Sequence, residues 1–164
     1  LTDAIRESTG SDIAVENSGS IRKDIRKGNI TAKSIRDVLP FNTYLVTMEL
    51  TGKDIKDLLE ISATTQDNLQ VSGLTMTVDY SQPAGKRVSD IKVQNKTLEH
   101  EKNYRVSTED FLALGFTEYT PFHRGKNISV GEATIEALKS YIKHHSPITS
   151  DIARIEGRIK FTLS

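Results

Sequence analysis

The sequence contains no cysteine, so disulfide bonds and metal sites built on thiolates are excluded. It also has no excess of charge, because 22 lysines and arginines balance 22 aspartates and glutamates. A balanced surface lacks the basic footprint typical of proteins that bind polymeric nucleic acid or anionic membranes. No apolar run reaches the roughly 18 residues that a membrane-spanning helix requires. We therefore expect a domain that contacts neither a nucleic acid polymer nor a membrane.

Common catalytic motifs are also missing. The four histidines form no His-Glu-x-x-His pattern and have no set of acids at ligand spacing. There is no Gly-x-Ser-x-Gly elbow, no Walker loop and no dinucleotide fingerprint. We expect this chain to hold no metal or cofactor and to contain no catalytic residue.

The 164 residues fit one domain with its own core. Helical spacing and strand alternation are interspersed without strict βα alternation, which favours an α+β fold with a mixed sheet packed by helices. We expect helices near residues 1–6, 31–39, 52–61 and 132–145, and strands near 12–16, 43–50, 74–80, 88–93, 104–106 and 159–163. The strands at 74–80 and 88–93 are expected to form a hairpin, and residues 51–54 (TGKD) have the pattern of a capping box at the start of the helix expected at 52–61. The polar residues 62–68 and the segment 107–115 are expected to be loops, and Tyr44, Phe161 and Leu163 are expected to point inward.

Residues 17–22 (NSGSIR) form a compact polar segment directly after the strand expected at 12–16. Small residues around Gly19 let backbone N–H groups approach a ligand, and Asn17 adds a side-chain amide. Arg22 supplies a fork of donors suited to phosphate or carboxylate. The segment is therefore a candidate binding loop, although an ordinary tight turn followed by a surface arginine would have the same sequence.

Two phenylalanines stand where a regular element is expected to meet a loop. Phe41 follows Pro40 at the end of the helix expected at 31–39, and Phe111 follows Asp110. Both could be core residues. If their rings instead face each other across a gap, they could hold a planar base by stacking, with Arg22 at the anionic end of the ligand.

Several motifs in order resemble the C-terminal domain of the 5'-nucleotidase family. These motifs are NSGSIR at residues 17–22, LPF at 39–41, LTGK at 50–53, DFLA at 110–113 and EGRI at 156–159. The family includes 5'-nucleotidases, UDP-sugar hydrolases and 2',3'-cyclic-nucleotide 2'-phosphodiesterases. The similarity extends over essentially all of residues 1–164, so this resemblance implies one substrate-specificity domain.

The resemblance also implies a role for particular residues. Phe41 and Phe111 match the two phenylalanines that sandwich the base, Asn17 matches the asparagine that contacts it, and Arg22 matches an arginine directed at the nucleotide. Catalysis would belong to an N-terminal metallophosphoesterase domain with two divalent metal ions such as zinc or manganese, which we expect to be absent from this chain. The parent would be an extracellular, periplasmic or cell-surface phosphoesterase, and the chain alone would be inactive.

One segment departs from the family pattern. Residues 115–118 read Gly-Phe-Thr-Glu where relatives commonly have Gly-Gly-Asp-Gly, so the aspartate that usually meets the ribose is missing. Glu118, one position on, is the candidate replacement. The alternative to a nucleotide-binding domain is a non-catalytic module with the same fold and a decayed nucleotide site.

Overall fold

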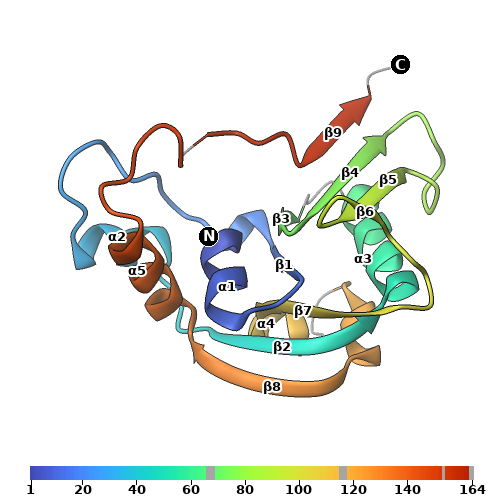
Figure 1. Cartoon of the computed structure of the whole chain (residues 1–164), viewed down its shortest axis with the longest axis horizontal. Helices are drawn as coiled ribbons and strands as arrows, with labels where there is room; N and C mark the ends of the chain where they lie inside the picture. The colour runs from blue at the N-terminus through green and yellow to red at the C-terminus, as the bar shows by residue number, and fades with distance from the viewer. Residues whose placement is uncertain (66–68, 115–117, 153, 163–164) are drawn as a thin grey trace.

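The computed structural model describes residues 1–65, 69–114, 118–152 and 154–162. Two sheets and the helices around them make up this part of the chain (Figure 1). The helices and 3-10 turns are α1 (Thr2–Thr9), η1 (Ser18–Ser20), α2 (Ala32–Val38), α3 (Gly52–Thr65), α4 (Asp110–Ala113), η2 (Thr120–Arg124) and α5 (Thr134–His144). The strands are β1 (Ile13–Glu16), β2 (Tyr44–Thr51), β3 (Gln70–Ser72), β4 (Leu74–Asp79), β5 (Val88–Val93), β6 (Lys96–Thr97), β7 (Asn103–Glu109), β8 (Lys126–Ala133) and β9 (Ile159–Thr162).

The α+β class with mixed sheets is confirmed, and the strands divide between two sheets. The five-stranded sheet has the order β3-β1-β7-β2-β8, and the four-stranded sheet has the order β6-β5-β4-β9. Within the first sheet β1 runs parallel to β7, while β2 runs antiparallel to β7. In the second sheet β4 and β5 form the expected hairpin, and β9 pairs with β4 in parallel.

The apolar core lies between these layers. Residues from both sheets, including Met48, Val78 and Val106, pack with Ile55 and Leu59 of α3. A smaller cluster joins α1, α2 and α5; α2 and α5 lie at one side of the molecule with α1 next to them, whereas α3 lies at the other side (Figure 1). The five-stranded sheet thus connects the two halves of the domain.

Local capping explains where two of the helices begin. The Thr31 hydroxyl accepts the Ser34 N–H at 3.1 Å at the start of α2. At the start of α3, the Thr51 hydroxyl accepts the Asp54 N–H at 3.2 Å, and Asp54 accepts the Thr51 N–H in return. This reciprocal arrangement is the capping box that the sequence predicts.

Two segments predicted to be loops are partly helical or extended. α3 continues to Thr65, because Ser62 and Ala63 are buried against the core rather than solvated. β7 continues to Glu109 because it is a central strand with partners on both sides, and α4 follows it directly. The remainder of each predicted loop, residues 66–68 and 115, lies outside the described residues.

The sequence analysis predicts no strand where β8 lies. The helix predicted to begin at 132 begins at Thr134, because the last residues of β8 occupy 132 and 133. β8 is an edge strand with nearly every residue exposed, so it shows no alternation of buried and polar side chains. Antiparallel pairing with β2 holds this strand in place.

Two aromatic side chains predicted to point inward are exposed instead. Tyr44 lies at the first position of β2, and Phe161 lies on β9 at the edge of the smaller sheet, where its ring stacks on Tyr80 with centroids 6.0 Å apart. Alternation of apolar and polar residues shows which side chains share one face of a strand, but it does not show whether other elements cover that face. Leu163 lies outside the described residues.

Candidate functional site

The candidate site lies at one end of the three inner strands of the five-stranded sheet. Because β1 and β7 are parallel and β2 is antiparallel to them, the C-terminal ends of β1 and β7 lie beside the beginning of β2. The predicted binding loop follows β1, Phe41 precedes β2, and Phe111 follows β7. Sheet topology therefore gathers three segments that are far apart in the sequence.

These segments enclose a pocket of about 300 Å³. It is lined by Asn17, Gly19, Ser20, Arg22, Phe41, Thr43, Glu109 and Phe111. Five of the six residues predicted from the sequence therefore line one pocket. Its volume is at the lower end of the range for small-molecule sites, about 300 to 1,000 Å³.

Neither phenylalanine belongs to the core. Phe41 is 48% exposed and Phe111 is 55% exposed, although both contribute to the pocket wall. Phe41 is placed by the end of α2 at Val38 and by Pro40, whereas Phe111 stands on the short helix α4. Large exposed aromatic rings beside a pocket are available for contact with a ligand.

Arg22 is held in place by three contacts. Its backbone N–H donates to the Val38 carbonyl at 2.9 Å, and its Nη1 donates to the Gly19 carbonyl at 3.1 Å. Its guanidinium carbon lies 5.9 Å from the centre of the Phe41 ring, within the range of a cation–π contact. The cation is thus fixed beside an aromatic wall, and it makes no ion pair with an acid in the part of the chain that the structure describes.

Asn17 and Gly19 form the turn between β1 and Arg22. Asn17 precedes η1 in an extended conformation, and its Oδ1 accepts the Ser20 hydroxyl at 2.5 Å. A Cβ at Gly19 would lie 3.4 Å from Asn17 Nδ2, so the glycine leaves this side of the amide open. The loop therefore presents a fixed amide and an uncovered backbone to the pocket.

Glu118 does not line the pocket. It is exposed, and its backbone carbonyl accepts the Thr120 N–H at 2.8 Å just before η2. Residues 115–117, which carry the departure from the family pattern, lie outside the described residues. A role for Glu118 at a ribose remains a prediction.

Two buried glutamates at the base of the pocket were not predicted from the sequence. Glu109 lines the pocket, and Glu16 lies beside Glu109, because the parallel strands β1 and β7 end at these two residues and the Ser20 hydroxyl contacts both carboxyl groups. Burial raises the pKa of Glu16 well above its ordinary value, and the charge of Glu109 adds to this effect. Burial also raises the pKa of Glu109, against hydrogen bonds from Thr43, Thr134 and Ser20. A glutamate at the end of each of two strands is the sequence signal, but only the parallel pairing brings them together.

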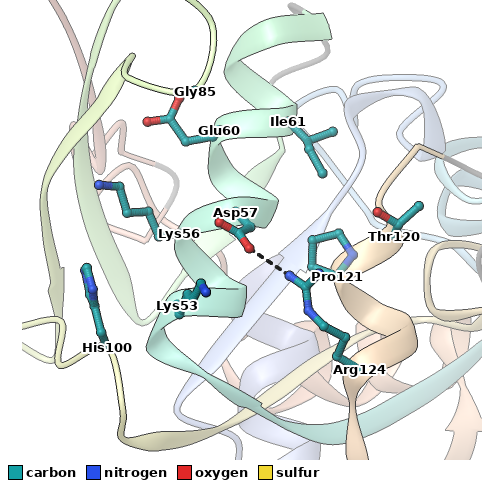
Figure 2. Close-up of a pocket in the computed structure, with 10 residues that line it drawn as sticks. All are labelled: Lys53, Lys56, Asp57, Glu60, Ile61, Gly85, His100, Thr120, Pro121 and Arg124. Atoms are coloured by element: carbon teal, nitrogen blue, oxygen red, sulfur yellow. Dashed lines mark hydrogen bonds and ion pairs between the residues drawn. The ribbon is translucent and has the colours of Figure 1, made fainter.

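A larger and more open hollow of about 550 Å³ lies beside α3 and η2 (Figure 2). Lys53, Lys56 and His100 lie at one side of it, and Arg124 lies at the other. Arg124 is already neutralised, because it bonds to Asp57 at 2.8 Å and to Asp54. None of the residues predicted to bind a ligand lies there, so size alone does not identify the functional site.

Among the described residues, no three His, Asp or Glu side chains gather closely enough to hold a metal ion. A dimetal centre therefore does not fit the residues described in this chain. The described helices also include none with the length and apolar character needed to cross a membrane.

Comparison with known proteins identifies the family. Residues 1–124 match the family described as 5'-nucleotidase, C-terminal domain. The protein UshA of Yersinia enterocolitica is 31% identical over 166 residues, which cover 98% of this chain and 29% of that relative. A 5'-nucleotidase of Vibrio vulnificus is 32% identical over 161 residues, which cover 94% of this chain and 28% of the relative.

A solved structure gives the same result. The 5'-nucleotidase precursor of Thermus thermophilus superposes with a TM-score of 0.87 at 32% identity, covering 99% of this chain and 34% of that protein. The chain thus spans about three tenths of the length of these curated relatives. The ordered motifs, the fold and these matches together show that the chain belongs to the 5'-nucleotidase C-terminal domain family.

Proposed function

We propose that this chain is the substrate-binding domain of a nucleotide phosphoesterase, a hydrolase of phosphoric esters. The base stacks between Phe41 and Phe111, Asn17 contacts the edge of the base, and Arg22 faces the phosphate. A preceding metallophosphoesterase domain, whose two divalent metals are expected from the family, performs the hydrolysis.

The observation that carries this proposal is that residues far apart in the sequence line the same pocket. Asn17, Gly19, Arg22, Phe41 and Phe111 come from three segments and line one pocket. The exposed rings and the fixed guanidinium match the two halves of a nucleotide, since a base binds by stacking and a phosphate by charge-assisted hydrogen bonds. The names of the relatives support the same substrate class, because several are 5'-nucleotidases.

Titration of the isotope-labelled chain with AMP, followed by NMR, tests the binding role. We expect the largest shifts at the backbone amides of residues 17–22, 41 and 111, and weaker binding in Arg22→Ala. Lys53→Ala, in the other hollow, is the matched control and should bind as the wild type does. Shifts centred on Lys53 and Arg124, or no shifts at millimolar AMP, would contradict the proposal and favour a module without a nucleotide site.

A second assay tests the division of labour. The chain, incubated with AMP and manganese, should release no phosphate above the rate without protein, because metal activation of water requires ligands that its described residues do not assemble. Hydrolysis that survives Arg22→Ala would show that the chain has a catalytic centre of its own.

A further inference from the structure

The hydroxyl of Ser20 lies among three oxygen atoms beneath the pocket. Its Oγ is 2.5 Å from Asn17 Oδ1, 3.0 Å from Glu16 Oε1 and 3.3 Å from Glu109 Oε2. Ser20 and both glutamates are buried. A serine hydroxyl carries one proton, so it can donate to only one of these three atoms at a time.

Counting protons indicates the charge of the acid pair. The shortest contact, to Asn17 Oδ1, takes the Ser20 proton. Of the other two contacts, one becomes a hydrogen bond if a carboxyl group is protonated and donates to Ser20 Oγ, and the other remains a contact between lone pairs. Two carboxyl groups that share a buried site do not both ionise readily. The observed geometry therefore corresponds to a Glu16–Glu109 pair that holds a proton.

The surroundings of the pair agree with this assignment. Glu16 is fully buried, and its Oε2 has no hydrogen-bond partner among the described residues. Burial raises the pKa of both carboxyl groups. Of the nearby charges, Asp110 raises the pKa of Glu109, while the Arg22 guanidinium is held by the Gly19 carbonyl and the Phe41 ring.

The same contact fixes which end of the Asn17 amide faces the ligand. Because Oδ1 is occupied by Ser20, the Nδ2 group lies on the other side, beside Gly19, which lines the pocket. The pocket therefore offers a hydrogen-bond donor. A base bound there presents an acceptor to Asn17, either a ring nitrogen or a carbonyl oxygen.

We propose that Ser20 is a positioning residue that couples the protonation of the Glu16–Glu109 pair to the orientation of the Asn17 amide. When the pair loses its proton to solvent, Ser20 turns its own proton to the carboxylate, and Asn17 Oδ1 loses its donor. The amide then rotates by half a turn, so Nδ2 donates to Ser20 and Oδ1 faces the pocket. The consequence for base recognition rests on the proposed function, whereas the coupling itself requires no ligand.

NMR on the ligand-free chain tests the coupling. We expect the Glu16 and Glu109 carboxyl carbons to titrate above the ordinary range, and the Asn17 side-chain amide signals to shift with the same midpoint. In Ser20→Ala the carboxyl carbons should still titrate while the Asn17 amide no longer follows them. Ser18→Ala, an exposed serine in the same turn, is the control and should keep the coupling. Asn17 signals that follow the pair equally in Ser20→Ala, or carboxyl groups that titrate at ordinary values, would overturn the proposal.

AMP binding as a function of pH gives the second readout. Affinity of the wild type should fall by up to about tenfold per pH unit above the midpoint, as for a site that requires one proton. The double variant Glu16→Gln, Glu109→Gln should lack this fall. The phosphate of AMP titrates near pH 6 itself, so the difference between wild type and variant is the measured quantity. If AMP binds to the wild type and to the double variant with the same pH dependence, the coupling proposed here is overturned while the proposed function stands. If AMP binds at no pH, the proposed function fails, and the ligand-free titration still decides the coupling.

Discussion

Replacing Phe111 by alanine should weaken nucleotide binding without destabilising the fold. The side chain is 55% exposed and lies outside the apolar clusters, so its removal opens no cavity in the core. In sites that stack bases on aromatic rings, loss of one ring costs about 1 to 3 kcal/mol per base. This corresponds to a rise of about 5-fold to 150-fold in the dissociation constant.

The assay is calorimetric titration of the chain with AMP, accompanied by thermal unfolding of each variant. Phe41→Ala should also weaken binding, and by more than its ring alone accounts for, because Arg22 loses the aromatic surface that its guanidinium contacts at 5.9 Å. Phe161→Ala is the matched control, since this ring is 49% exposed and lies on β9 in the other sheet. It should bind AMP as the wild type does.

If Phe111→Ala binds AMP within twofold of the wild type while remaining folded, the ring does not stack on the base. If Phe161→Ala weakens binding as much as Phe111→Ala, the effect belongs to general stability rather than to the pocket.

Three further predictions concern stability. The free energy of unfolding should fall as pH rises above 4.5, the ordinary pKa of a glutamate, because burial raises the pKa of Glu16 in the folded state. Between 4.5 and the raised pKa, the folded state binds more protons than the unfolded chain, so stability decreases with pH over this window. Urea unfolding of Glu16→Gln should show a flatter pH dependence, and an unchanged slope would contradict this. Thr51→Ala should lower stability by about 1 kcal/mol in urea unfolding, since it removes the hydroxyl that accepts the Asp54 N–H at the start of α3; an unchanged midpoint would show that this cap contributes nothing. Gly73→Ala should lower the free energy of unfolding by at least about 2 kcal/mol, because the residue has φ +81° and the added Cβ would lie 2.0 Å from a backbone carbonyl oxygen. Gly85→Ala is the control, since Gly85 has φ +84° but open space around it, and it should show only the smaller cost of backbone strain. Equal losses of stability in the two variants would rule out the steric clash.

Much of the fold follows from local patterns in the sequence. The hairpin of β4 and β5 follows from alternation around a turn, and α3 from its capping box. β8 could not be found in this way, because an exposed edge strand has no buried face to mark its period. The division into two sheets was equally hidden, since strand pairing is set by contacts distant in sequence.

The site shows the same division. Asn17, Arg22, Phe41 and Phe111 could be named because each belongs to a short motif. Glu109 could not, because its neighbour in the parallel pair, Glu16, lies far away in the sequence and the two acids matter only together. Burial, not residue type, gives these carboxyl groups their chemistry.

A crystal structure of the chain grown with AMP tests the central claim most directly. We expect the adenine ring between Phe41 and Phe111, the Asn17 amide within hydrogen-bond distance of the base, and the phosphate on the side of Arg22. AMP bound instead in the hollow beside Arg124, or with its base outside the two rings, would contradict it.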